Sequence, residues 1–291
     1  QKAARVLCSE DYRTALRQQL AAGARSFAAA RQAAVQALCP GKDIAALLDK
    51  PNNNLAVEYC KAIIEQNVEM QPIALPRQGA DHGQALTESS HAAFASASAL
   101  RALWAKGGAA ALAPYVPEKA LKLYKQAEYD GKYTDFAVMG HCELALLRAA
   151  CTEQAPFAAV RGVSEGLEHR LENAVRETAS LPTLLDALTT VRYPRARMRR
   201  LAMDAALGYT AQTPALPPYL HLLGARKEAL SLPGETALPL SHSLARLARE
   251  NETCAQMAAA QSRASDLGAL CRTKPEPMGG IYRQKIIFLT N

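Results

Sequence analysis

Apolar residues recur at helical spacing through most of this chain. Leu16 and Leu20 lie about one turn apart with charged residues around them, and Gly23 interrupts the pattern. Ser26 can cap a following helix over 28–38. A short apolar stretch at 43–48 adds one more helix. We therefore expect residues 1–50 to be helical.

The pattern changes between residues 51 and 101. Residues 55–66 indicate a helix, with Asn52 at its start as a cap. Apolar residues then alternate over 68–75, which favours a strand interrupted by Pro72. A polar loop follows over 77–90, and another helix begins at Ser96 or Ser98. A helix, a strand and a polar loop together form half of an α/β repeat.

From residue 118 onward the pattern is almost entirely helical. Pro114 and Pro117 interrupt it just before, so we place a domain boundary near residue 113. The fold class expected is α/β plus all-α, with an α/β part over 1–113 and a mainly helical part over 114–291. The expected helices are 119–128, 136–152, 165–179, 181–190, 196–207, 218–223, 241–249 and 252–270, with a closing strand within 281–289.

Composition narrows the class of protein only slightly. The hydrophobic fraction of 49% and the charged fraction of 21% are ordinary for a globular protein. The formal net charge of +7 is compatible with a polyanionic partner without identifying one. Seven cysteines occur singly with no CxxC pair, which favours reduced thiols in the cytoplasm over disulfides or a protein-bound metal. No apolar run is long enough to span a membrane, and no signal peptide precedes the first helix.

Two residues near the predicted strand are candidates for anion binding. Asn52 can hydrogen-bond a ribose or a phosphate at a helix N-terminus, or simply cap that helix. Arg77 follows the strand, where ligands bind in open α/β sheets, but it can equally form a surface ion pair. His82, next to Asp81, is either a proton shuttle or a turn residue.

A third candidate lies at the start of the next helix. Ser96 and Ser98 place two hydroxyls at its N-terminus, and Arg101 follows one turn later. Such an arrangement can hold a phosphate through hydroxyls, free backbone N–H groups and one guanidinium. The alternative is a capped helix with an exposed arginine.

The second half of the chain contains a dense group of cations around one aromatic residue. This segment can grip RNA phosphates and stack a base. The alternative is a solvated helix face paired with nearby acids such as Glu165 and Asp186. Its residues are Arg192, Tyr193, Arg195, Arg197, Arg199 and Arg200.

Several of these motifs, taken in order, resemble the bacterial tRNA(Met) cytidine acetate ligase family of the HxGH nucleotidyltransferase superfamily. Residues 51–59 resemble its PNN-x-LG-x-x-Y signature, and residues 95–101 resemble IASATxIR. Further matches resemble EGLExR at 164–170, KRYTxTRIQR at 192–200 and YxRxLG at 219–224. The chain departs mildly from the family, with Ala56 in place of glycine, Phe94 in place of isoleucine and Ser98 in place of threonine.

The resemblance implies a fold and an activity. Residues 1–113 would be the C-terminal part of a Rossmann-like nucleotidyltransferase domain without its N-terminal strands, and 114–291 a mainly helical tRNA-binding domain. Members activate acetate with ATP to give acetyl-adenylate and transfer the acetyl group to N4 of the wobble cytidine of elongator tRNA(Met). Mg²⁺ is expected to accompany ATP. The implied ATP contacts are Asn52, Arg77, Gln78, Ser96, Ser98 and Arg101, and the implied tRNA contacts are the cations and Tyr193 named above.

The largest departure is the lack of an HxGH motif, whose histidines stabilise the phosphates in this superfamily. The only His-Gly pair is His82-Gly83, and the chain begins at Gln1 without methionine. We therefore expect a truncated chain that is catalytically impaired, whereas a full-length member would be an enzyme. Two alternatives remain: a non-catalytic RNA-binding remnant, and a nucleotidyltransferase acting on a small molecule.

Overall fold

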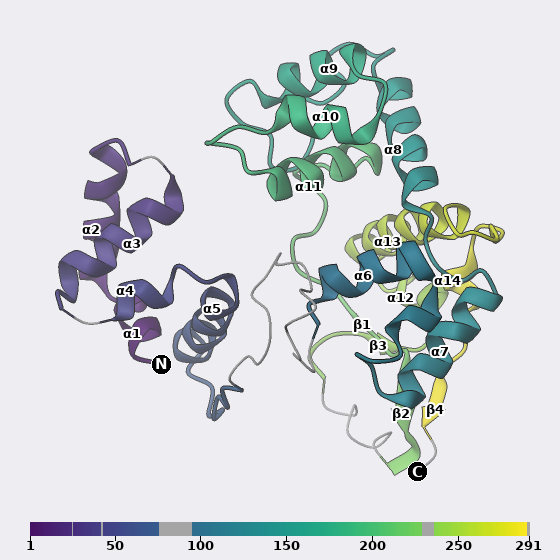
Figure 1. The fold of residues 1–291 in the computed structure, drawn as a ribbon, viewed down its shortest axis with the longest axis horizontal. Helices are drawn as coiled ribbons and strands as arrows, with labels where there is room; N and C mark the ends of the chain where they lie inside the picture. Colours follow the sequence, from purple (N-terminus) through teal and green to yellow (C-terminus); the bar gives the residue numbers. More distant parts are fainter. Residues whose placement is uncertain (25, 42, 76–94, 229–235, 290–291) are drawn as a thin grey trace. The chain divides into compact units, whose positions relative to one another are not determined.

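The computed structural model describes residues 1–24, 26–41, 43–75, 95–228 and 236–289 (Figure 1). The chain divides into two compact units, Gln1–Gly79 and Ala80–Asn291, and each is described by itself. The domain boundary expected near residue 113 stays a prediction. The short turn Ala109–Leu112 contacts the helices on both sides of it.

The described part of the first unit is helical. Ser9 and Ser26 cap the second and third helices by accepting from the backbone N–H groups of Tyr12 and Ala29, both at 3.2 Å. The expected cap at Ser26 is thereby confirmed. The core combines small side chains such as Ala4 and Ala34, which let the helices approach closely, with larger ones such as Leu7. The helices are α1 (Lys2–Cys8), α2 (Glu10–Ala21), α3 (Phe27–Leu38), α4 (Ile44–Leu47) and α5 (Pro51–Glu65).

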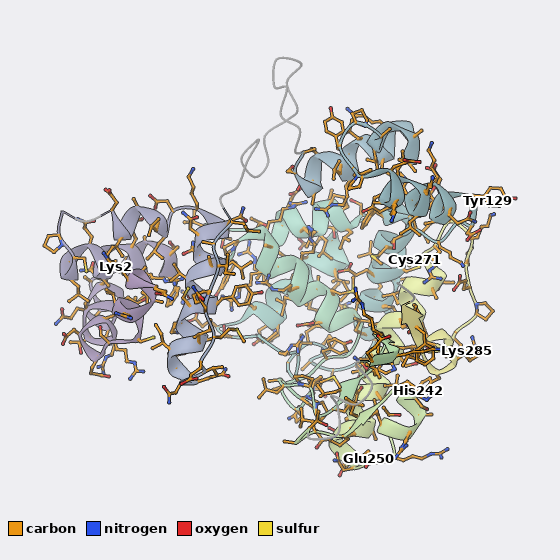
Figure 2. All side chains as sticks on the ribbon, turned by 90° about the horizontal axis from the view of Figure 1, so that it is seen from below. Lys2, Tyr129, His242, Glu250, Cys271 and Lys285 are labelled. Carbon is orange, nitrogen blue, oxygen red and sulfur yellow. The ribbon has the colours of Figure 1, made fainter. Side chains whose placement is uncertain are left out.

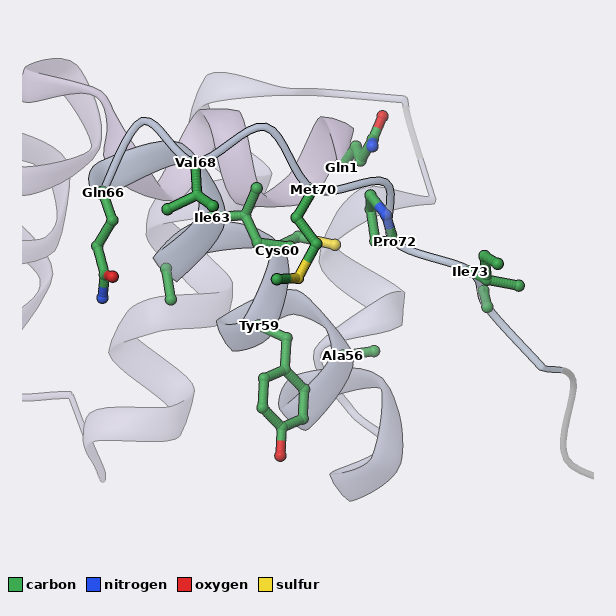
Figure 3. Close-up of a pocket in the computed structure, with 12 residues that line it drawn as sticks. Gln1, Ala56, Tyr59, Cys60, Ile63, Gln66, Val68, Met70, Pro72 and Ile73 are labelled. Atoms are coloured by element: carbon green, nitrogen blue, oxygen red, sulfur yellow. The ribbon is translucent and has the colours of Figure 1, made fainter. Parts of the chain in front are cut away.

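Two sequence predictions around α5 are wrong. The helix begins at Pro51 rather than Leu55, so Lys50 occupies the N-cap position and Asn52 lies inside the first turn. Residues 68–75 form no strand, since no strand within the described residues of this unit can pair with them. Figure 3 shows this segment carrying Val68 and Met70 back along α5 instead.

The second unit is also mainly helical, with two short pairs of parallel strands. β1 (Leu220–His221) pairs with β3 (Leu240–Ser241), and β2 (Gly224–Arg226) pairs with β4 (Ile287–Leu289). The helices are α6 (Ala97–Gly107), η1 (Ala109–Leu112), α7 (Glu118–Tyr129), α8 (Phe136–Ala150), α9 (Leu167–Glu177), α10 (Leu181–Leu188), α11 (Arg195–Ala206), α12 (Leu244–Leu247), α13 (Glu252–Leu270) and α14 (Gly280–Arg283).

The C-terminal third contains two further corrections. The helix predicted over 218–223 is absent, because Leu220 and His221 pair with Leu240 and Ser241 as strands. Of the strand predicted within 281–289, only Ile287–Leu289 form a strand, because α14 includes residues 281–283. Neither pairing was visible from local spacing, because both partners lie far away in sequence.

Two hydrophobic clusters hold the second unit together. The larger joins α8, α9, α10 and α11 around Leu147, Leu171 and Leu188, all fully buried. The smaller joins Tyr219 to α12 and α13. Cys271, just after α13, is fully buried, whereas the side chain of Tyr129 is exposed (Figure 2). Among the described helices, none combines the length and apolar character needed to cross a membrane.

Candidate nucleic-acid interface and nucleotide-binding residues

The arginine-rich segment lies on α11 and the loop before it. The inward face of α11 buries Met198, Leu201 and Ala202 against the larger cluster. Helical periodicity then directs Arg195, Arg199 and Arg200 outward, and the structure shows all three exposed. The same pattern that builds the core therefore presents the cations on the surface.

Tyr193 is the centre of this surface. Its hydroxyl donates to Oε2 of Glu165 at 3.1 Å, and Arg192 forms an ion pair with the same carboxylate. The guanidinium carbons of Arg197 and Arg192 lie 5.1 and 5.8 Å from the centre of the tyrosine ring, within cation–π range. We call Arg192, Tyr193, Arg195, Arg197, Arg199 and Arg200 the arginine surface.

Glu165 has an unusual backbone conformation. Its φ is +57°, in the left-handed region that residues with a side chain rarely adopt, and it precedes α9 directly with Gly166. Such a conformation costs of the order of 1 kcal/mol and persists where surrounding contacts hold it. Here the contacts come from Tyr193 and Arg192, beside a cavity of about 450 Å³ that both Glu165 and Tyr193 line.

The ion-pair alternative left open by the sequence applies to part of this surface. Arg192 pairs with Glu165 and Arg195 with Asp186, on exposed side chains. Arg197 instead donates to the carbonyl oxygen of Gly162 at 3.4 Å. Exposed ion pairs contribute about 0–1 kcal/mol, so a phosphate can replace them at little cost.

Three cations of the surface lack an acidic partner. Within the described residues, Arg197, Arg199 and Arg200 form no ion pair with a carboxylate. Their charges are therefore available to an anion from outside the chain.

The predicted nucleotide-binding residues are distributed over both units. Asn52 is exposed on the first turn of α5, where the helix presents unpaired N–H groups. Arg77 and Gln78 lie outside the described residues, as does His82. Asn52 belongs to the first unit, whereas Ser96, Ser98 and Arg101 belong to the second.

Ser96 is the N-cap of α6. The residue is 5% exposed, and its hydroxyl accepts from the backbone N–H of Ala99 at 3.2 Å, so the helix itself already uses this hydroxyl. Ser98 lies in the first turn and Arg101 is exposed one turn later. Capping of α6 and contact with a phosphate are compatible roles for this motif, since a cap hydroxyl can also face an anion.

Two acidic residues add to what the sequence indicated. The sequence pattern presents Glu165 only as an ion-pair partner, although its place in the EGLExR-like stretch could have indicated a role in the candidate site. Glu143 was not singled out, yet it is only 1% exposed and lies among apolar residues on α8. A charged residue inside an apolar helix face is the pattern that could have identified it. No group of three or more metal-binding side chains occurs in the part of the chain that is described.

Comparison with known proteins assigns the chain to a family. The family model described as HIGH Nucleotidyl Transferase matches residues 1–279. The chain belongs to the HIGH nucleotidyl transferase family. The HxGH nucleotidyltransferase superfamily expected from the sequence motifs is thereby confirmed.

Curated relatives of this HIGH nucleotidyl transferase are named tRNA(Met) cytidine acetate ligase. The protein of Listeria monocytogenes serovar 1/2a is 31% identical over 186 residues, which cover 62% of this chain and 45% of that protein. The protein of Caldanaerobacter subterraneus is 29% identical over 212 residues, covering 71% and 50%. The chain thus spans about half the length of the curated relatives it matches.

Solved structures show the same fold. Thermotoga maritima TmcAL in its apo form matches with a TM-score of 0.84 at 21% identity, over 99% of this chain and 74% of that one. The same protein bound with alpha-thio ATP matches equally well, over 73% of its length. The expected fold class, a part of a nucleotidyltransferase joined to a mainly helical domain, is therefore confirmed.

Proposed function

We propose that this HIGH nucleotidyl transferase belongs to an ATP-dependent ligase. The ligase forms acetyl-adenylate and acetylates N4 of the wobble cytidine of elongator tRNA(Met). The observation that carries this proposal is the arginine surface, where two guanidinium groups lie within cation–π range of the Tyr193 ring. The names of the curated relatives support the choice of tRNA and acetate.

The chemistry of the arginine surface suits an RNA backbone. Arg197, Arg199 and Arg200 form no ion pair within the described residues, and each phosphate they contact releases condensed counterions. Tyr193 supplies a flat ring, already oriented by Glu165, on which an unpaired base can stack. We propose that the second unit binds tRNA through these residues.

The proposed ATP contacts come from both units. Asn52 and the N-terminus of α5 suit a ribose or a phosphate, and Ser98 with Arg101 suits a phosphate at the N-terminus of α6. The remaining contacts of this proposal are Arg77, Gln78 and Ser96. Mg²⁺ usually binds through few carboxylates and the substrate phosphates, so we propose that it arrives with ATP. The structure of Thermotoga maritima TmcAL bound with alpha-thio ATP supports nucleotide use.

We further propose that the chain as printed binds tRNA without forming acetyl-adenylate at a substantial rate. Its sequence contains no HxGH motif, whose donors would stabilise the charge that develops as acetate attacks the α-phosphate. Incubation with ATP, radiolabelled acetate and elongator tRNA(Met) tests this directly. Absence of acetylcytidine together with tight tRNA binding is expected, and substantial acetylcytidine would contradict the impairment.

A non-catalytic RNA-binding role is the second candidate, and the lack of HxGH in the printed sequence favours it. The two candidates differ in ATP binding. Equilibrium dialysis of the chain with labelled ATP separates them, since a ligase part that retains its contacts retains measurable affinity, whereas an RNA-binding remnant retains tRNA affinity alone.

A further inference from the structure

A second cavity lies next to the arginine surface, within the second unit. It measures about 480 Å³, is open to the surface, and is lined by residues of α8, α10 and α11. Apolar side chains such as Met139, Leu181 and Met203 form most of its wall. This volume is within the range of pockets that hold small organic ligands.

One buried acid lines this apolar cavity. Glu143 on α8 is 1% exposed, and its Oε1 has no hydrogen-bond partner within the described residues. An unpaired buried carboxyl oxygen is costly, and proteins seldom retain one without a use. Its site therefore favours a ligand that donates a hydrogen bond.

Two arginines line the same cavity. Arg195 and Arg199 lie one turn apart on α11, and both are exposed members of the arginine surface. The cavity thus combines apolar walls, one buried acceptor and two cations. A nucleotide has matching parts, since its base is flat and largely apolar on its faces, its edge donates hydrogen bonds, and its phosphate is an anion.

We propose that this cavity binds an unpaired RNA base carrying an exocyclic amino group, with Glu143 accepting from that amino group and Arg195 and Arg199 contacting the adjoining phosphate. Cytosine, adenine and guanine each carry such a group, whereas uracil does not. The proposal rests on the proposed RNA-binding function and adds to it a second point of contact, one that distinguishes between bases.

The burial of Glu143 agrees with this assignment. Desolvation raises the pKa of its carboxyl to about 7, and the charge of Arg199 opposes part of that rise. The protonated acid can donate to a ring nitrogen while it accepts from an amino group, as cytosine and adenine require. The ionised acid can accept twice from guanine.

Short single-stranded RNAs test the inference. Fluorescence anisotropy would compare a labelled oligouridylate with the same oligomer carrying one central cytidine, adenosine or guanosine. We expect at least one amino-bearing base to bind about tenfold more tightly than uridine, as one specific hydrogen-bonded contact provides. Equal affinity for all four oligomers would overturn the proposal.

Variants at Glu143 assign the discrimination to this residue. Glu143→Leu removes the acceptor and suits the apolar wall, so the tenfold preference for an amino-bearing base over uridine is expected to disappear. Glu143→Gln keeps an amide oxygen as acceptor and is expected to retain a preference for an amino-bearing base. A preference that persists in Glu143→Leu would overturn the assignment, even if that preference is real.

Failure of the two proposals gives different results. Oligomers that bind without any base preference would contradict the cavity inference alone and leave tRNA binding intact. If neither the oligomers nor tRNA bind, the proposed RNA-binding function fails and the inference fails with it. Circular dichroism of each variant checks folding, and the wild-type comparison of four oligomers needs no variant.

Discussion

Tyr193 donates its hydroxyl to the carboxylate of Glu165 across 28 positions of sequence, at 3.1 Å. The bond joins the loop before α11 to Glu165, which directly precedes Gly166, the N-cap residue of α9. The backbone of Glu165 has a left-handed conformation. Arg192 binds the same carboxylate. The loop that carries Arg192 and Tyr193 is thereby tied to the residue that precedes the N-cap of α9.

Tyrosine replacement separates this structural role from stacking on RNA. Tyr193→Phe removes one exposed hydrogen bond and is expected to lower the free energy of unfolding by about 1 kcal/mol or less, with little change in tRNA affinity. Tyr193→Ala also removes the ring and is expected to weaken tRNA binding about tenfold, the contribution of one stacked base. Urea unfolding and filter binding measure the two effects. Equal tRNA affinity for both variants would show that no base stacks on this ring.

Serine replacement tests which hydroxyl caps α6. Ser96→Ala removes the acceptor for the N–H of Ala99 and is expected to cost about 1 kcal/mol of unfolding free energy. Ser98→Ala is the matched control, because Ser98 is not the N-cap residue, and it should leave stability within about 0.5 kcal/mol. Thermal or urea unfolding checks both. A larger loss for Ser98→Ala than for Ser96→Ala would contradict the assigned cap.

The raised pKa of Glu143 predicts how stability depends on pH. In the folded chain this carboxyl binds its proton up to about pH 7, whereas its ordinary pKa is 4.5. The folded state therefore holds more protons in that window, and stability falls as pH rises through it. Relative to Glu143→Gln, wild type should lose about 2–3 kcal/mol between about pH 5 and about pH 8. Urea unfolding across this range measures the difference, and a flat difference would show an ordinary pKa.

Local patterns sufficed for most of the helices. Helix α13 matches its expected range, and α7 is longer than its own expected range by one residue at each end. Apolar periodicity and caps depend on neighbouring residues, so local patterns predict them. The strands were mispredicted because their partners are distant. Alternation over 68–75 indicated a strand, but a strand needs a neighbour, and that segment lies on α5 instead. Leu220 is extended only because it pairs with Leu240.

The candidate sites show a similar limit. The cations beside Tyr193 are visible in the sequence, but the choice of tRNA contact over a solvated helix face rests on the family resemblance. The contact of Tyr193 with Glu165 and the burial of Glu143 depend on packing between helices, which the sequence does not display. The relation of Asn52 to Ser96 could be proposed only from family resemblance, because each belongs to a different unit.

The central claim is that the arginine surface binds tRNA, and paired arginine removal tests it. Arg195→Ala combined with Arg197→Ala removes two cations whose present partners are an exposed acid and a backbone carbonyl. Arg13→Ala combined with Arg17→Ala is the matched control, since both lie on α2 of the first unit in exposed ion pairs with Glu10. Both variants lose the same formal charge.

The decisive measurement is the affinity for elongator tRNA(Met) as a function of salt, between about 50 and about 200 mM. The account predicts weaker binding for the Arg195/Arg197 variant, with a log–log salt slope smaller in magnitude by about 1 to 2, while the Arg13/Arg17 variant follows wild type. Unchanged affinity and slope in the Arg195/Arg197 variant, or an equal loss in both variants, would contradict it.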